Sequence, residues 1–375
     1  MMQATIRWLR VNLLSNFSSA VLSLALIGLC AWASWSLLSW AIWTAQWQVI
    51  GSSMRVLMAG TYPVDSIWRA WVSALVLFGL SGATLGMLIR LPRVIAVGVG
   101  LVSLLIALLS AGSMLGLSWG AYCVLSGVLG WALTAYVPVV RRVMGVLWLI
   151  GVVLIGALLA EAGTERWGGL LLSVLVTLVA AVLSLPVGIL LALGRRSRYS
   201  SARVLCAGYI EVMRALPLIL VVYCLWIMTP FIVPSVNVPD LARGVLGFSL
   251  FFSAYVAEYI RSGLQSVPRG QVEAAQALGM SNWHINRDIV LPQALRVTTP
   301  ALVGNVLDIF NNVPLLFIIG LTDFLRAGQM VMINPQTAGR TYEIYIFMFI
   351  VYMAVASIIT YGCRRLEDRM NQGGR

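Results

Sequence analysis

Four polar side chains interrupt an apolar run at residues 299–321 and could contact a polar solute: Asn305, Asp308, Asn311 and Asn312. A charge at the middle of a bilayer costs about 2.5–3.5 kcal/mol on insertion scales, so Asp308 is not expected to face lipid. At about 100° per residue, Asn305, Asp308 and Asn312 share one helical face. Asp308 could pair with an ammonium group and the asparagines could hydrogen-bond a carboxylate. Equally, these side chains could only hydrogen-bond to a partner subunit.

Other kinds of site chemistry have little support in the sequence. His284 is the single histidine, and the five cysteines share no CxxC spacing, so a metal site or a disulfide framework is not expected. All 25 basic residues are arginine. A phosphate-binding P-loop needs a lysine, so any ATP hydrolysis must occur on another polypeptide. Acid–base catalysis is also disfavoured, because the chain lacks a cluster of His, Asp and Glu.

The composition predicts a polytopic membrane protein. Of 375 residues, 60% are hydrophobic and 10% are charged, whereas soluble domains have roughly 45–50% and about 25%. The net charge of +12 could suggest nucleic acid. However, the arginines fall singly or in short clusters between apolar runs, which favours anchoring in a membrane over nucleic-acid binding.

Apolar runs of about the length of a membrane-spanning helix, ~20 residues, recur along the whole chain. We expect an all-α fold built from up to ten of them: 19–44, 70–89, 94–116, 119–139, 143–160, 169–193, 212–233, 243–260, 299–321 and 344–362. The weakest are 119–139, which carries glycines and Pro138, and 143–160, which is short. Eight spans therefore remain an alternative. The first run is too long for a signal peptide and is read as an uncleaved span.

The arginines predict the orientation. If the N-terminus is cytoplasmic and ten spans alternate, nineteen arginines lie inside and six lie outside, namely Arg55, Arg69, Arg166, Arg243, Arg326 and Arg340. This split follows the positive-inside rule. Both termini are then expected in the cytoplasm.

One cytoplasmic loop, between the runs that end at Ile260 and begin at Thr299, has a helical pattern of its own. Good helix formers fill residues 271–278, and Gly279 is placed to end them with a left-handed cap. Ser281 can cap a second short helix that runs to about Val290. Pro292 is expected to separate this pair of helices from the next segment. The result would be a compact protrusion suited to a pocket on another protein.

This loop resembles the EAA loop of ABC importer permeases at every spacing. The residues that carry the resemblance are Glu273, Ala274, Ala275, Gly279, Ile289, Leu291 and Pro292. Sequences around it are similar to the polar amino acid branch of that family: Trp167-Gly168-Gly169-Leu170, Tyr209-Ile210-Glu211, Ala257-Glu258 and Pro292-Gln293-Ala294-Leu295-Arg296. Two further segments look most like the second permease subunits of general L-amino acid transporters, Gly60-Thr61-Tyr62-Pro63 with Trp68-Arg69, and 323–329. The segment 310–315 departs from the usual family pattern.

The resemblance implies a permease subunit of an ATP-driven importer for L-amino acids, not an enzyme. It implies a five-span core at 167–363 with the coupling loop at 261–298, an N-terminal extension at 1–166 with about three to five more spans, and a cytoplasmic tail at 364–375. The implied partners are a homologous permease subunit, two ATP-binding subunits and a periplasmic amino acid-binding protein, in a bacterial inner membrane. No cofactor is expected on this chain, and ATP and Mg would sit on the ATPase. A secondary, ion-coupled carrier is the alternative, with the polar residues of 299–321 as its coupling site.

The orientation can be tested by labelling single cysteines from outside in sealed right-side-out vesicles. Engineered cysteines at Asp65 and Gln336 should react with an impermeant reagent, whereas cysteines at Gln276 and Asn371 should not, because the arginine distribution places the latter pair in the cytoplasm. Labelling at position 276 would overturn both the orientation and the proposed role of the loop.

Overall fold

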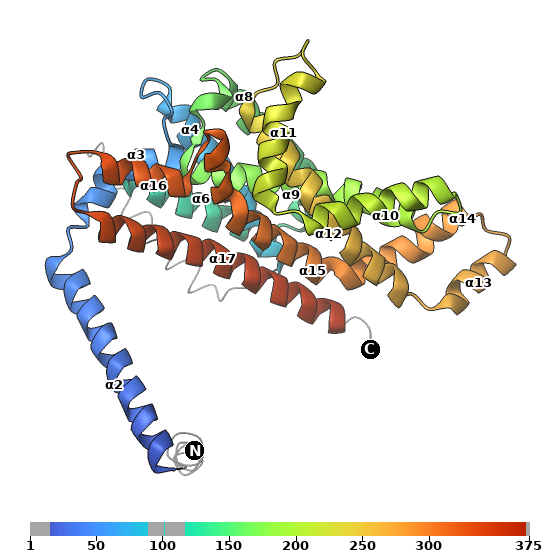
Figure 1. Ribbon diagram of the computed structural model, residues 1–375, viewed down its shortest axis with the longest axis horizontal. Helices are drawn as coiled ribbons and strands as arrows, with labels where there is room; N and C mark the ends of the chain where they lie inside the picture. The colour runs from blue at the N-terminus through green and yellow to red at the C-terminus, as the bar shows by residue number, and fades with distance from the viewer. Residues whose placement is uncertain (1–15, 89–100, 102–116, 373–375) are drawn as a thin grey trace. The chain divides into compact units, whose positions relative to one another are not determined.

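The computed structural model describes residues 16–88, 101 and 117–372, which are almost entirely helical (Figure 1). The chain divides into two compact units at residue 49. The first unit contains α2 (Phe17–Ser39), which continues through the π-helical turn η1 (Trp40–Thr44). Together they form a 28-residue apolar helix long enough to cross a membrane, as the run 19–44 predicted. No residue of α2 is buried.

The second unit begins with helices that pack around α4 (Ile67–Leu88). Helix α6 (Leu117–Tyr136) runs parallel to α4. Ser126 donates a hydrogen bond to the Leu75 carbonyl (2.8 Å) and Thr134 donates one to the Ala83 carbonyl (2.7 Å). Each acceptor lies 51 residues before its donor, so the two helices advance in the same direction. The arginine-based map predicts this parallel direction for the runs 70–89 and 119–139. Short helices α3 (Gln48–Ala59) and α7 (Pro138–Arg142) flank the group.

Glycines allow α4 and α6 to approach closely. A Cβ added to Gly82 would lie 1.9 Å from the carbonyl oxygen of Gly127, and one added to Gly130 would lie 2.0 Å from that of Gly79. Small residues in this pattern are the usual means of close helix packing in membranes, where the hydrophobic effect does not drive association.

Helix α8 (Met144–Ala160) runs antiparallel to α4. Near one end of the pair, the Trp148 indole N–H donates to Thr84 Oγ1 (2.9 Å), and at the other end Arg69 forms a salt bridge with Glu161. Helices α4, α6 and α8 are therefore packed together, and the one-turn 3₁₀ helix η2 (Thr164–Arg166) follows α8.

The C-terminal half is a second group of long helices interrupted by short ones (Figure 1). In chain order these elements are α9 (Gly169–Arg195), α10 (Ser200–Ala215), α11 (Leu218–Ile232), α12 (Asp240–Ser266), α13 (Arg269–Ala277), α14 (Asn282–His284), η3 (Ile285–Val290), α15 (Leu291–Asn312), η4 (Val313–Ile319), β1 (Thr322–Asp323), α16 (Phe324–Ile333) and α17 (Thr341–Gln372). Helix α12 packs along α9, α11 and α15.

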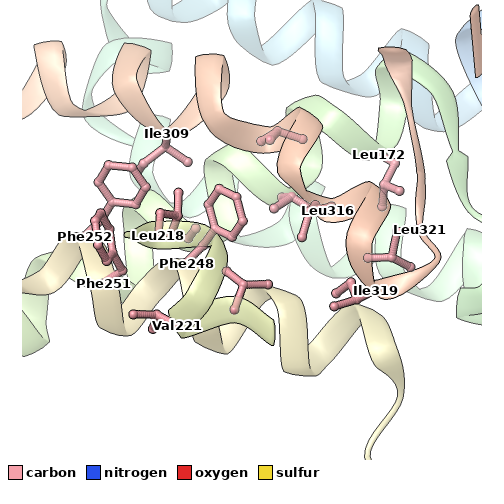
Figure 2. Packing of buried hydrophobic residues seen from close by; sticks show 14 residues of the cluster. Leu172, Leu218, Val221, Phe248, Phe251, Phe252, Ile309, Leu316, Ile319 and Leu321 are labelled. Atoms are coloured by element: carbon pink, nitrogen blue, oxygen red, sulfur yellow. The ribbon is translucent and has the colours of Figure 1, made fainter. Parts of the chain in front are cut away.

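A buried aromatic and aliphatic cluster holds these helices together (Figure 2). Phe248 and Phe252 of α12 meet Leu172 of α9, Ile309 of α15 and Leu316 of η4. Their side chains are at most 4% exposed. Such packing stabilises the association of helices in a bilayer, because interdigitated side chains make closer van der Waals contacts with one another than with lipid tails.

Six described helices are long and apolar enough to cross a membrane, and α10 with α11 would add a seventh if the bent pair counts as one span. With that pair, five spans follow residue 166: α9, α10–α11, α12, η3–α15–η4 and α17. The predicted all-α polytopic fold with a five-span core and an N-terminal extension is thus confirmed. The run 94–116 lies outside the described residues, and the run 143–160 forms the shorter helix α8.

The run 212–233 is not one straight helix, contrary to the prediction. Helices α10 and α11 meet at an angle of 111°. Leu216, which precedes Pro217, is extended (φ −87°, ψ 145°), as residues before proline tend to be. The bend leaves α10 as a separate amphipathic helix. The apolar run in the sequence therefore predicted a longer straight helix than the structure contains.

Candidate functional site

The coupling loop, residues 261–298, has the helix–turn geometry that the sequence predicted. Helix α13 ends at Ala277 and is followed, after Leu278, by Gly279, whose φ is +78°. The Met280 N–H donates to the carbonyl of Ala275 (3.1 Å) and the Gly279 N–H donates to that of Gln276 (2.9 Å). These two bonds form a Schellman cap, which requires the left-handed residue that glycine adopts without steric cost.

The second half of the loop differs from the prediction at Pro292. Ser281 does cap the next helix, since its Oγ accepts the His284 N–H (3.4 Å) and lies 2.8 Å from His284 Nδ1. That helix continues through the π-helical η3 into α15 without a break, so Pro292 does not separate the two. In η3 the N–H of Leu291 bonds five residues back to Asn286. The wider π turn gives the proline ring room beside the preceding carbonyls.

Buried side chains attach the coupling loop to the spans. Ala275 and Ile285 are each 3% exposed and share a cluster with Ile210 of α10 and Ile260 of α12. At the base of the loop, the Gln293 side-chain amide donates to Gln271 Oε1 (2.6 Å) and to the Ile289 carbonyl (3.0 Å). The loop is therefore packed against the ends of the spans.

The exposed part of the loop contains more than the predicted residues. Glu273, Ala274, Gly279 and Pro292 are exposed, whereas Ala275 is buried and Ile289 and Leu291 are half-buried. Two large apolar side chains that the motif did not single out are also open: Leu278 is 83% exposed and Trp283 is 68% exposed. They flank the Gly279 turn, and large apolar residues in an otherwise polar loop were the sequence signal that could have identified them. Exposed apolar side chains of this kind mark interaction surfaces.

Charged side chains join α9, α10 and α12 close to the coupling loop. Glu258 forms ion pairs with Arg195 (3.4 Å), Arg214 (3.6 Å) and Arg261. The pair of Glu258 with Arg261 lies within α12 at i, i+3 spacing. Glu211 of α10 instead pairs with Arg195 of α9 (3.0 Å). Interhelical pairs of this kind need the tertiary fold and cannot be read from spacing along one helix.

The polar residues of α15 do not all share one environment. Asn305 is 3% exposed, and its Oδ1 has no hydrogen-bond partner. Asp308 and Asn311 are exposed on the surface of this chain, and the Asn312 amide donates to the Asp308 carbonyl (2.8 Å). The predicted single strip is therefore divided into a buried amide and an exposed group around Asp308.

Comparisons with known proteins identify the family of the chain. Residues 184–372, just over half of the chain, match the family described as binding-protein-dependent transport system inner membrane component. The chain belongs to this family. It is 30% identical to the inner membrane amino-acid ABC transporter permease protein YhdY of Escherichia coli (strain K12), over 98% of this chain and 93% of the relative. It is 31% identical to the glutamate/glutamine/aspartate/asparagine transport system permease protein BztC of Rhodobacter capsulatus, over 92% of this chain and 89% of the relative.

One solved structure with a related sequence matches about half of the chain. It is a crystal structure of an amino acid ABC transporter with histidines, 28% identical, with a TM-score of 0.48, and the match spans 54% of this chain and 92% of that one. The family match and the two full-length relatives show that the chain is an ABC importer permease subunit, a multi-pass protein of the inner membrane, and not an enzyme. Membership of this family disfavours the ion-coupled carrier, and it implies that an ATPase and a substrate-binding protein are partners.

The opposite ends of the permease spans meet in a second site, formed by residues 60–62, 166–169 and 322–324. We call it the outer junction because the orientation predicted from the arginines places it outside. Thr322 and Asp323 form parallel backbone bridges with Gly168 and Gly169. Gly60 has φ +66°, and a Cβ on it would lie 2.5 Å from the Cα of Gly168. The junction therefore joins the extension, α9 and α16 through backbones that approach too closely for side chains.

Hydrogen bonds fasten the outer junction on each side of these glycines. The Trp167 indole donates to the Leu159 carbonyl (2.9 Å), and Ser173 Oγ accepts the Phe324 N–H (3.0 Å). The motif Gly60-Thr61-Tyr62-Pro63, noted earlier only as a resemblance, thus has a structural role. Tyr62 is 1% exposed.

Asp323 is the buried acid of the outer junction and is fully buried. Its two carboxylate oxygens accept the N–H groups of Leu325 (2.9 Å) and Arg326 (3.1 Å), which caps helix α16. Burial raises the pKa of this carboxyl from its ordinary 3.8 to about 6, even though the two hydrogen bonds act in the opposite direction. The ionised form therefore carries a desolvation cost at neutral pH.

The role of Asp323 can be tested by following the thermal unfolding of the purified permease from pH 4 to pH 8. The pKa of Asp323 is higher in the folded state than in the unfolded state. This carboxyl group therefore contributes its full stabilisation below about pH 3.8, and the contribution is lost as the pH rises through about 6. Asp323→Asn keeps an acceptor for the cap and should remove this pH dependence. Asp323→Ala loses the cap and should destabilise the protein by about 1 kcal/mol. An unchanged pH dependence in Asp323→Asn would contradict this assignment.

Proposed function

We propose that this chain is the L-amino acid permease subunit of an ATP-driven importer, and that its coupling loop transmits the action of a separate ATPase to the spans. The observation that carries the proposal is the combination of an open tip and a buried base in one loop. Glu273, Ala274, Leu278 and Trp283 are open to a partner, whereas Ala275 and Ile285 are packed against α10 and α12.

The assembly that fits this role has four kinds of chain. This subunit would pair with a homologous permease, bind two ATP-binding subunits through the two coupling loops, and receive substrate from a periplasmic amino acid-binding protein. ATP and Mg would be held by the ATPase, since this chain has no lysine for a P-loop. Both termini would lie in the cytoplasm. The division into extension 1–166, core 167–363 and tail 364–375 belongs to the same proposal.

Movement at the loop would reach the membrane through two sets of contacts. Because Ala275 and Ile285 pack against α10 and α12, displacement of the tip must move those helices or break the packing. The Glu258 ion pairs join the same helices to α9. The loop and the cytoplasmic ends of these three spans would then respond to the ATPase as one body.

Two relatives that align with this chain over most of their length are named as amino acid permeases, and these names support an amino acid as the substrate. The candidate pathway residues are Asn305, Asp308, Asn311 and Asn312. Asp308 is exposed on this chain within a span, where a lipid-facing charge would be costly, so we place it against the partner permease or the pathway between the two subunits. There its carboxylate could receive a substrate ammonium group.

Coupling through the loop can be tested by substituting Gly279 in the reconstituted complex. Gly279→Val places a β-branched residue at φ +78°, which costs about 1–2 kcal/mol or more. The population of loops that dock correctly should therefore fall roughly tenfold. Amino acid uptake and substrate-stimulated ATPase activity should fall together while the protein still inserts.

Two control variants separate backbone conformation from added bulk. A Cβ at Gly279 or at Gly270 would meet no atom within 4 Å, and Gly270 does not have a positive φ. Gly279→Asn, which tolerates the left-handed region, and Gly270→Val should therefore retain most activity. Full coupled activity in Gly279→Val would show that this turn is not the coupling element.

The pathway can be tested by measuring amino acid uptake in Asp308→Asn and Asn312→Ala, normalised to assembled complex. A role in lining the pathway predicts altered selectivity or a raised KM, with assembly unchanged. If assembly is lost and the remaining complex keeps its selectivity, these residues serve only the contact between subunits.

A further inference from the structure

Two of the core spans are discontinuous, and both are interrupted against the same stretch of α12. The α10–α11 span breaks at Leu216–Pro217, and the span 285–319 changes from the α-helix α15 to the 3₁₀ helix η4 at Val313. Leu218, the first residue of α11, and Val313 both belong to the buried cluster that contains Phe252 of α12 (Figure 2). In transporters of other classes, substrates bind near the middle of the bilayer where such interrupted helices meet.

Charged side chains of opposite sign lie beside these two interruptions. Arg214 is near the end of α10, and Asp308 is four residues before the end of α15 at Asn312. Tyr259 of α12 interacts electrostatically with both Arg214 and Asp308. The Arg214 guanidinium also lies 5.7 Å from the centroid of the Tyr255 ring. One cation and one anion from different helices are therefore grouped around two phenol rings of α12.

Asp308 has no counter-ion on this chain. None of the ion pairs in the part of the chain that the structure describes includes its carboxylate, which is exposed. The Asn312 amide donates to the backbone carbonyl of Asp308 and not to the carboxylate. A carboxylate within a span needs a positive charge or hydrogen-bond donors, and lipid tails offer neither. The missing positive charge must therefore come from outside this chain.

Arg214 has the most binding capacity left among the arginines around Glu258. Three arginines share the carboxylates of Glu258 and Glu211, so this group carries one positive charge in excess. The Arg214–Glu258 contact is the longest of these ion pairs, at 3.6 Å. The Arg214 side chain is 44% exposed, against 27% for Arg195 and 32% for Arg261. Its remaining N–H groups can hold a second carboxylate in a bidentate contact.

The two charges need a ligand that carries both signs. Arg214 and Asp308 form no ion pair with each other, although Tyr259 interacts with both. A purely anionic ligand would leave Asp308 unbalanced, and a purely cationic one would leave the excess charge at Arg214. A zwitterion satisfies both groups at once.

We propose that Arg214 binds the α-carboxylate and Asp308 the α-ammonium group of a free α-amino acid. The rings of Tyr255 and Tyr259 form the wall of this site, and aromatic faces favour a cationic group. The inference rests on the proposed amino acid transport and adds the group that holds the carboxylate. Both contacts are made to groups that all α-amino acids share. This site therefore does not select the substrate side chain.

Pairing each ligand charge with its residue tests the proposal. The purified complex, without binding protein or ATP, is titrated with L-glutamine, L-alanine, and the α-carboxamide and N-acetyl form of each, and affinity is measured by calorimetry. In the wild type, either modification should weaken binding roughly ten- to hundredfold, as expected for loss of a charge-assisted hydrogen bond. In Arg214→Gln the acid should bind as weakly as its amide, whereas N-acetylation should still weaken binding. Asp308→Asn should show the reverse.

Two further variants separate this role from a structural one. Arg203→Gln is the matched control, because Arg203 is also exposed on α10 and belongs to none of the ion pairs in the described ranges. It should keep both preferences at their wild-type values. Arg214→Lys retains the charge without the planar fork and should keep part of the preference for the acid over the amide. This variant also covers the case in which Arg214→Gln does not assemble.

Three results would overturn the proposal. These are equal binding of acid and amide by the wild type, an unchanged preference for the acid in Arg214→Gln, and a complex that transports amino acids but binds neither L-glutamine nor L-alanine. None of them bears on coupling through Gly279, because binding is measured without ATP. Failure of this site and failure of the coupling loop are therefore distinguishable.

Discussion

The attachment of the coupling loop to the spans is the interaction on which this account depends. A protrusion can transmit force to the spans only if its base is attached to them. Ala275, Ile285 and Val290 are each at most 4% exposed and pack with Ile210 of α10 and Ile260 of α12. The left-handed Gly279 turns the chain at the tip without a steric penalty, so the two arms of the loop can both reach this cluster. The small side chain of Ala275 is buried in this cluster.

The outer junction imposes the corresponding constraint at the other end of the spans. Backbones of Gly60, Gly168 and Thr322 approach so closely that side chains are excluded, and the bridges between 168–169 and 322–323 fix the start of α9 beside α16. A movement that begins at the coupling loop and reaches α9 through the Arg195–Glu258 ion pair therefore acts on a helix whose far end is held. Bending or rotation within the spans, as at the 111° break before α11, can absorb such a movement more easily than sliding of whole helices.

Much of this could be predicted from the sequence because the bilayer restricts the possible structures. Apolar runs predicted the spans, since backbone groups in lipid must be satisfied within a helix. The EAA spacing and Gly279 predicted the loop because a Schellman cap has a local sequence signature. What could not be predicted depends on tertiary contacts: the pairing of Glu211 with Arg195, the burial of Asn305, and the use of glycines 60, 168 and 169 in one junction. Pro292 misled the prediction because the π-helical turn in η3 accommodates a proline that an α-helix would not.

The most direct test of the central claim identifies the chain that touches the tip of the coupling loop. A photo-crosslinking amino acid is placed at Leu278, which is 83% exposed, in the intact complex in its native membrane, with Val64, 63% exposed on the other side of the predicted topology, as the control. The account predicts that position 278 crosslinks to the ATP-binding subunit and that position 64 does not. If position 278 crosslinks only to lipid, or gives no adduct while transport is active, the loop is not the contact through which ATP hydrolysis drives this permease.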